Sequence, residues 1–109
     1  MPANPHQIVL TTCPDLVIAK QIANALVTEG LAACVNILSA MHSIYTWHGK
    51  TEAAMEHLLL IKSLTRRYPA IQDRIRELHP YELPEIIAIS ITQGLPDYLA
   101  WLNNPEKTR

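Results

Sequence analysis

The feature that most constrains this chain is a long extended segment in its middle. From Ala32 to His48, apolar and other residues alternate over seventeen positions, and a return segment follows from Thr51 to Ser63. A strand advances about 3.3 Å per residue, so the first segment alone would span roughly 55 Å. A domain of this size has a radius of gyration near 13 Å, hence a diameter of about 35 Å. The hairpin therefore either breaks near Ser39-Ala40 or reaches beyond its own core.

The tip of this hairpin carries apolar and aromatic side chains. Gly49-Lys50 is a plausible turn, and Ile44, Tyr45, Trp47 and Met55 lie close to it. An isolated hairpin is only marginally stable in water, whereas packing on a second copy would extend the sheet and bury aromatic area. A head-to-tail contact must close into a ring to avoid open fibres, which suits a trimer better than a dimer. We expect a homotrimer with Tyr45 and Trp47 at its interface; the alternative is a hairpin bent back over its own sheet.

The flanking segments predict two strands and two helices. A short apolar run predicts a strand over His6–Thr12, and Pro14-Asp15 then opens a helix that ends at Glu29-Gly30. Thr65 is the expected cap of a second helix, which Pro80 stops. The fourth strand, Ile86–Thr92, is apolar enough on both sides to be central in a sheet.

A last short helix follows Gly94 and carries Tyr98, Trp101 and Leu102 on one face. The element order is then βαββαβ with a C-terminal helix. Right-handed crossovers fold this order into an α+β, ferredoxin-like sandwich, in which helices cover one face of a four-stranded antiparallel sheet. We expect one domain over residues 1–109, with flexible ends at 1–5 and 104–109.

Composition limits the partners of the chain. Of its 109 residues 49% are apolar and 17% charged, and the net charge is −1. This balance argues against disorder and gives no positive excess for nucleic acid or an anionic membrane, so neither is expected as a partner. No apolar run exceeds five residues, which is far shorter than the roughly 20 residues of a membrane helix. Met1–His6 also lacks the plan of a signal peptide, so we expect a cytoplasmic protein.

Cysteines and histidines offer few metal patterns. Cys13 and Cys34 have neither redox nor zinc spacing, which predicts two reduced thiols. No two histidines form an HxH or HExxH motif. His79 ends the second helix before a proline loop. Its neutral imidazole could accept a metal, or its cation could complement the helix C-terminus without any ligand.

Two charges in the return strand point to a polar site. Glu56 and Lys62 stand at i and i+6, on one face of an otherwise apolar strand. Cys34 lies on the adjoining strand and Tyr81-Glu82 in the loop before the fourth strand, so these five residues could gather in a cleft between subunits; the alternative is a solvated outer face. Four arginines form a basic edge on the second helix, either solvated or anion-binding: Arg66, Arg67, Arg74 and Arg76.

Five segments together closely resemble the CutA family of divalent-cation tolerance proteins, in order, over roughly Ile8 to Asn103. They are GLAACVN at 30–36, YTWHGK at 45–50, IKS at 61–63, HPYELPEI at 79–86 and YLAWL at 98–102. The resemblance implies a cytoplasmic homotrimer of ferredoxin-like subunits, similar in architecture to the PII signalling proteins. It implies a role in divalent-metal response with copper binding, and no catalysed reaction.

The resemblance also implies a metal position. The ligands proposed for the family are a cysteine in the first strand and two adjacent histidines at the end of the second helix. The second of those histidines corresponds to His79, whereas Leu78 stands at the first and Thr11 at the cysteine, with Cys13 two positions later. If copper or another divalent metal binds, we therefore expect His79, with Cys13 as a nearby soft donor.

Two further hypotheses belong to other classes of function. One is a PII-like sensor that holds a small anionic molecule or nucleotide in the inter-subunit cleft. Its expected lining is Cys34, Glu56, Lys62, Tyr81 and Glu82. The other is a structural trimer that acts as a scaffold for unknown partner proteins. An enzyme is the least expected of the four.

Overall fold

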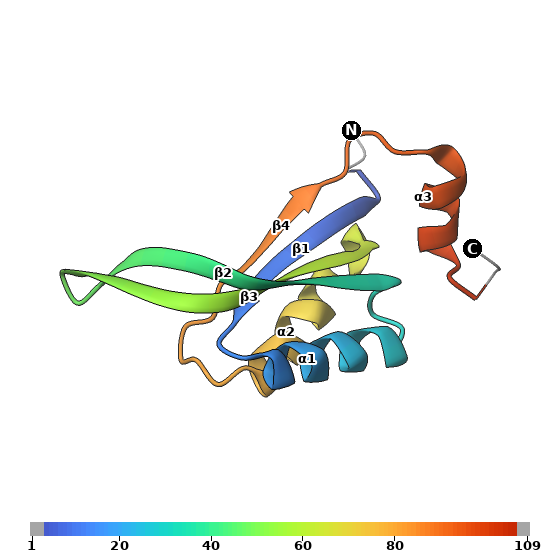
Figure 1. Ribbon diagram of the computed structural model, residues 1–109. Coiled ribbons are helices and arrows are strands. Elements are labelled where there is room, and N and C mark those ends of the chain that lie inside the picture. The colour runs from blue at the N-terminus through green and yellow to red at the C-terminus, as the bar shows by residue number, and fades with distance from the viewer. Residues whose placement is uncertain (1–3, 107–109) are drawn as a thin grey trace.

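The computed structural model of the chain describes residues 4–106, and its elements follow the predicted order (Figure 1). The strands are β1 (His6–Cys13), β2 (Cys34–Trp47), β3 (Lys50–Leu64) and β4 (Ile86–Ser90). The helices are α1 (Leu16–Thr28), α2 (Tyr68–Leu78) and α3 (Pro96–Asn103), and a 3-10 turn, η1 (Thr65–Arg67), precedes α2. None of these helices is long and apolar enough to cross a membrane.

The four strands form one antiparallel sheet in the order β2-β3-β1-β4. Helices α1 and α2 lie together on one face of this sheet (Figure 1). The predicted ferredoxin-like sandwich is therefore confirmed. The core lies between the two layers, where the most deeply buried apolar side chains are those of Val9, Ile22, Leu26, Leu59, Ile61, Ile71 and Ile75.

Local capping sets the ends of α1. The Asp15 carboxylate accepts a hydrogen bond of 2.8 Å from the Ile18 N–H, which satisfies one of the free donors of the first turn. Beyond the other end, Gly30 adopts a φ of 74°, a conformation that glycine reaches without steric cost. Both ends agree with the sequence pattern.

Thr65 is not the helix cap that the sequence suggested. Helix α2 begins at Tyr68, and the Thr65 hydroxyl instead donates to the Asn4 carbonyl at 2.6 Å. The Thr65 N–H donates to the Pro5 carbonyl at 2.8 Å. Asn4 and Pro5 are therefore hydrogen-bonded to the start of η1, and at the other end the Asn104 N–H donates to the Trp101 carbonyl at 3.0 Å. Flexible ends at 1–5 and 104–109 stay a prediction, of which 1–3 and 107–109 lie outside the described residues.

The regular pairing of β2 and β3 is interrupted close to Ser39-Ala40, where the predicted excess length of the hairpin called for a break. A β-bulge separates Leu38 from Met41, and Ala40 within it has a φ of 65°. Beyond the bulge the hairpin projects away from the sandwich, along the longest of the molecular extents, 45 × 32 × 23 Å (Figure 1). The turn occupies His48-Gly49, at φ values of 50° and 74°, one residue earlier than expected.

Strand β4 is an edge strand, and the prediction of a central position was wrong. It also ends at Ser90 rather than Thr92. A central strand is apolar on both sides because both faces of its sheet are covered. Here Ile86 faces the helices while Ile87 and Ile89 face the other side, which α1 and α2 leave bare.

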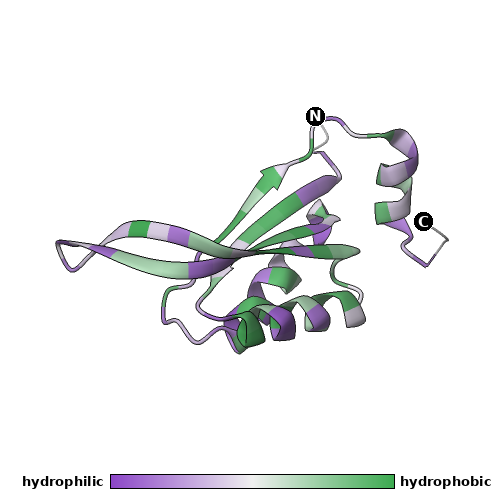
Figure 2. Cartoon of the chain, in the orientation of Figure 1, coloured by the Kyte–Doolittle hydropathy of each residue, from purple (hydrophilic) through white to green (hydrophobic). Residues whose placement is uncertain are grey.

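That side of the sheet carries a group of large apolar side chains. Residues paired directly across antiparallel strands share one face, so the register places seven large side chains on the face away from α1 and α2. We call this the open face: Ile8, Leu10, Leu38, Leu58, Leu60, Ile87 and Ile89. Three of them are about half exposed, at 48% for Leu38, 50% for Ile87 and 54% for Ile89. Figure 2 shows hydrophobic residues along β1 and β4.

Candidate functional site

His79 fixes the loop that follows α2. Its Nδ1 lies 3.1 Å from the Tyr81 backbone nitrogen and its Nε2 lies 2.7 Å from the Thr12 carbonyl oxygen. A backbone N–H can only donate and a carbonyl can only accept. The imidazole is therefore neutral, with its proton on Nε2, and it ties the loop to the end of β1.

This arrangement leaves His79 no free nitrogen. The side chain is buried, and both ring nitrogens are used within the chain. A metal ion at Nε2 would have to displace the Thr12 carbonyl, and one at Nδ1 would have to displace the Tyr81 N–H. A neutral ring also contributes no cation to the end of α2, so His79 acts here as a hydrogen-bonded link.

Cys13 is equally closed to a metal. Its side chain is fully buried in the core, and burial raises the pKa of the thiol from 9.0 to about 11, with smaller contributions from the charges of Asp15 and Glu56. Metal ligation requires the thiolate. At the other two positions implied by the family, the Thr11 hydroxyl is buried without a hydrogen-bond partner in the described chain, and Leu78 packs against the core.

Copper takes thiolate, thioether or imidazole donors, and these residues do not provide such a set within one chain. Among residues 4–106, no three histidine, cysteine, aspartate or glutamate side chains come together in a group able to hold a metal ion. The donors present therefore do not fit the copper site that the family resemblance implies.

Three of the five predicted cleft residues do come together. Glu56, Tyr81 and Glu82 line a hollow of about 480 Å³ between the hairpin and the loop after α2. The two aromatic residues predicted for a trimer interface, Tyr45 and Trp47, line the same hollow. We call it the hairpin hollow, and its complete lining is Thr12, Tyr45, Trp47, Glu56, Pro80, Tyr81, Glu82, Leu83 and Glu85.

Tyr81 and Glu56 interact directly in this hollow. The Tyr81 hydroxyl donates a hydrogen bond of 3.3 Å to Oε2 of Glu56. Burial raises the pKa of Tyr81, and the charge of Glu56 adds to this effect because a tyrosinate beside a carboxylate is disfavoured. Tyr81 therefore stays a neutral donor, and the nearly buried Glu56 keeps the other oxygen for a further partner.

The other two predicted cleft residues lie elsewhere. Cys34 and Lys62 are paired across β2 and β3, six positions along β3 from Glu56, which corresponds to about 20 Å. The Lys62 ammonium donates to the Asn36 side-chain oxygen. Within one chain the five residues thus form two groups on one face of the sheet, and a cleft that joins them between subunits stays a prediction.

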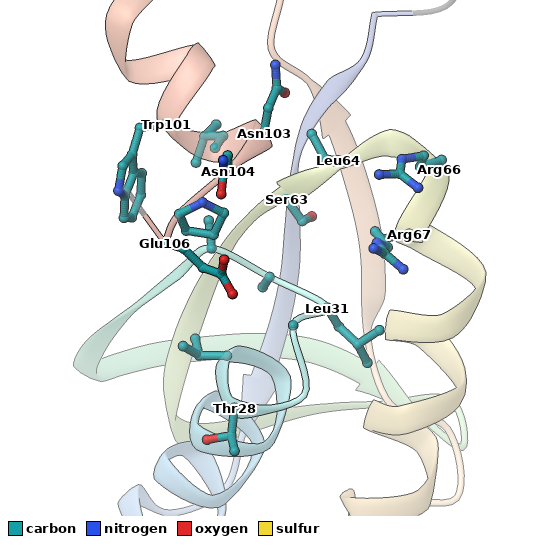
Figure 3. A pocket seen from close by; sticks show the side chains of 16 residues that line it. Thr28, Leu31, Ser63, Leu64, Arg66, Arg67, Trp101, Asn103, Asn104 and Glu106 are labelled. Atoms are coloured by element: carbon teal, nitrogen blue, oxygen red, sulfur yellow. The ribbon is translucent and has the colours of Figure 1, made fainter. Parts of the chain in front are cut away.

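The predicted basic edge also divides in two. Arg74 forms a bidentate ion pair with Glu29, at 3.0 Å from Nε and 2.9 Å from a terminal nitrogen. Arg66 and Arg67 instead line a second hollow of about 480 Å³, across from Trp101 of α3 (Figure 3). We call it the α3 hollow; it lies among the end of α1, the residues between α1 and β2, the end of β3, η1, and α3 with the residues after it. Its lining includes Gly30, Leu31, Ser63, Arg66, Arg67, Trp101, Asn103, Asn104 and Glu106.

Sequence reasoning missed parts of both hollows. Leu83 and Glu85 follow Pro80 in a loop whose path depends on the His79 hydrogen bonds, which no sequence spacing reveals. The α3 hollow depends on where α3 packs, and a single aromatic face does not specify that. The unusual density of proline, acid and aromatic residues over 80–85 was the one signal that pointed to this loop.

Comparison with known proteins decides the family. The family model described as "CutA1 divalent ion tolerance protein" matches residues 7–105. This chain belongs to the CutA1 family. The "Divalent-cation tolerance protein CutA" of Thermus thermophilus is 47% identical over 97 residues, covering 89% of this chain and 94% of that protein. "Protein CutA" of Mus musculus is 46% identical over 84% of this chain, which spans 52% of the mouse protein.

Solved structures of the CutA1 family have the same fold. The CutA1 structure from the psychrotrophic bacterium Shewanella sp. SIB1 superposes with a TM-score of 0.91 at 43% identity, covering 94% of this chain and 96% of that one. The Cut A1 structure from Thermus thermophilus gives a TM-score of 0.87 at 46% identity, covering 89% and 94%. These similarities confirm the family resemblance seen in the sequence, and a general role in divalent-cation tolerance comes with it.

The buried Cys13 thiol predicts a loss of stability in alkali. In the unfolded chain the thiol loses its proton near 9.0, whereas in the folded chain it keeps it up to about 11. Between these values the unfolded state binds fewer protons, so the free energy of unfolding falls as pH rises, by about 2–3 kcal/mol in total from this group.

Urea denaturation at about pH 8 and about pH 11 measures this loss, and Cys13→Ala should lose correspondingly less. The variant serves as the reference because Tyr81 titrates in the same direction in both proteins. Equal losses in the two proteins would contradict the assigned environment of Cys13.

Proposed function

We propose that this chain acts in divalent-cation tolerance as a non-enzymatic homotrimer built on the open face of its sheet. Membership of the CutA1 family supports the tolerance role. The observation that carries the assembly is the uncovered open face itself. The scaffold hypothesis differs from this proposal only in requiring a further partner protein.

The open face gathers seven large apolar side chains, and three of them, Leu38, Ile87 and Ile89, are about half exposed in a single chain. Soluble monomers rarely expose contiguous apolar patches beyond a few hundred Å². Full burial of an exposed isoleucine or leucine contributes roughly 1.5–3 kcal/mol, and the half-exposed Leu38, Ile87 and Ile89 would each gain part of this. A copy of the same chain is a suitable cover because it presents the same apolar residues. The projecting hairpin is continuous with this face, since the register puts Tyr45, Trp47 and Glu56 on the same side.

The cysteine chemistry supports a non-enzymatic role. The Cys13 thiol is buried with a raised pKa, and neither Cys13 nor Cys34 has a hydrogen-bonded base among residues 4–106. A nucleophilic cysteine would need a base or a lowered pKa. We also propose a cytoplasmic location, as the sequence suggested.

Placing a charge on the open face should break the assembly. Ile89→Lys puts an ammonium where apolar area would be buried between copies, which the interface cannot solvate. Sedimentation at micromolar concentration should give a species near 37 kDa for the wild type, three times 12.3 kDa, and a species near 12.3 kDa for the variant.

Val17→Lys is the matched control, because Val17 is an exposed apolar residue on α1, on the other side of the molecule. It should sediment like the wild type. A wild-type species near 12.3 kDa would refute the trimer, and an unchanged Ile89→Lys profile would refute the interface.

We expect copper binding to be the same in the wild type and in His79→Ala. Because both His79 nitrogens are already hydrogen-bonded, calorimetric titration with Cu²⁺ should give the same heat for wild type and His79→Ala. The same substitution removes two buried hydrogen bonds and should lower the free energy of unfolding by about 2–4 kcal/mol. A saturable copper signal that disappears in His79→Ala would instead establish the family-implied ligand in this chain.

A small-anion sensor is the second candidate, and the α3 hollow favours it over the predicted cleft. Arg66 and Arg67 line this hollow, and neither forms an ion pair within residues 4–106. The hairpin hollow, by contrast, contains three carboxylates and no lysine or arginine, so a nucleotide would be repelled there.

A thermal-shift titration with ATP tests this second candidate. We expect stabilisation of the wild type that is lost in the Arg66→Ala/Arg67→Ala double variant. Arg76→Ala, which removes an exposed arginine outside the hollow, should behave like the wild type. No shift in the wild type would exclude this anion, and an effect of Arg76→Ala equal to that of the double variant would indicate non-specific attraction.

A further inference from the structure

The outer edge of β4 carries a row of backbone groups without partners. On its inner edge β4 pairs with β1, and the Ile91 N–H continues this ladder by donating to the His6 carbonyl at 3.0 Å. In an antiparallel pair only every second residue bonds the neighbouring strand, and the residues between them point away from it. Counting back from Ile91, the N–H and C=O groups of Ala88 and Ser90 therefore point outward, and no hydrogen bond within residues 4–106 uses them.

The projecting hairpin has a similar row on the outer edge of β2. Its two-residue turn makes Trp47 and Lys50 the closing hydrogen-bonded pair. From this pair, every second residue of β2 back to Met41 bonds β3, and the residues between them point away from it. The outward residues are His42, Ile44 and Thr46. No other strand of the described chain lies beside this edge.

Neither edge is protected against a further strand. Proteins normally protect free edges with charged side chains, prolines or a covering segment. The sequence of β4 is IIAIS, and that of β2 from Met41 to Trp47 is MHSIYTW, so neither contains a lysine, an arginine, an acid or a proline. Both edges are therefore able to accept a strand by backbone hydrogen bonding.

The two free edges also match in the faces of their side chains. Residues directly opposite one another in an antiparallel pair share a face. Ala88 has its side chain on the side of α1 and α2, because it lies between Ile87 and Ile89 of the open face. Ile44 lies on this same side, because the bulge places Tyr45 on the side of the open face. Antiparallel pairing of the two edges thus keeps the helices on one side and continues the open face on the other.

We propose that β4 of one copy pairs antiparallel with the outer edge of β2, over Met41–Trp47, in the next copy. This inference rests on the proposed homotrimer and adds which strands join. Pairing of β4 with β4 would be isologous and would give a dimer, whereas pairing of β4 with β2 is heterologous and can close a ring. These strands are the two opposite edges of the sheet (Figure 1), so each copy can offer one edge to each neighbour. The hairpin thereby gains the neighbouring strand that it lacks in a single chain.

Proline substitution separates this contact from the fold of one chain. Proline removes the N–H, and a strand tolerates it at an edge position whose N–H points outward. Ala88→Pro and Ile44→Pro each remove one outward N–H and leave the inward ladder bonds in place. Sedimentation at micromolar concentration should give a species near 12.3 kDa for both variants, against a species near 37 kDa, three times 12.3 kDa, for the wild type. Circular dichroism should show both variants folded.

Ala88→Gly and Ile44→Ala are the matched controls, because they change the same side chains but keep the N–H. Both should sediment like the wild type. A wild-type species near 12.3 kDa would refute the homotrimer itself. If the wild type is a trimer and a folded Ala88→Pro or Ile44→Pro variant remains one, the homotrimer stands and the strand pairing is wrong.

Amide hydrogen exchange in the unmodified protein decides the question if a proline variant does not fold. The N–H groups of Ala88 and Ile44 have no acceptor within residues 4–106. Pairing between copies should therefore slow their exchange by at least about a hundredfold relative to an unstructured peptide. Exchange at the rate of the unstructured peptide at both positions of the trimer would overturn the proposal.

Discussion

The structure depends on the position of β3 between β1 and β2. This strand is long enough to serve two purposes at once: its C-terminal half pairs with β1 to form the centre of the sandwich, while its N-terminal half supports the hairpin. Alternation then sorts its side chains. Leu59, Ile61 and Ser63 face the helices, whereas Glu56, Leu58 and Lys62 face the opposite side, so one strand defines both the core and the surface proposed for assembly.

Much of the fold could be predicted because the relevant signals are local. The alternation in the hairpin, the cap at Asp15 and the glycine at position 30 each act within a few residues. The excess length of the middle segment also located the bulge near Ala40 correctly. The errors arose where two structures give one pattern. Ile86–Ser90 is apolar on both sides whether it is a central strand or an edge strand whose second face is uncovered, and Thr65 can bond a distant carbonyl as well as a helix end.

The site was less predictable because it depends on contacts far apart in the sequence. Glu56 and Lys62 were placed correctly on one face, but alternation gives only the face, and six positions along a strand keep the two side chains about 20 Å apart. The role of His79 illustrates the same limit. A histidine after a helix is compatible with metal binding, with a helix-end cation or with a neutral link, and only the partners Thr12 and Tyr81 distinguish these.

The bulge near Ala40 has one consequence for the hairpin that its modest size does not suggest. Up to Leu38, the even-numbered residues of β2 point to the open face; after the inserted position, the odd-numbered residues do. A regular strand would have turned Ile44 and Thr46 toward the loop after α2 and sent Tyr45 and Trp47 to the reverse side. One additional residue thus shifts the phase of the whole arm, and every aromatic contact at its outer end depends on that shift.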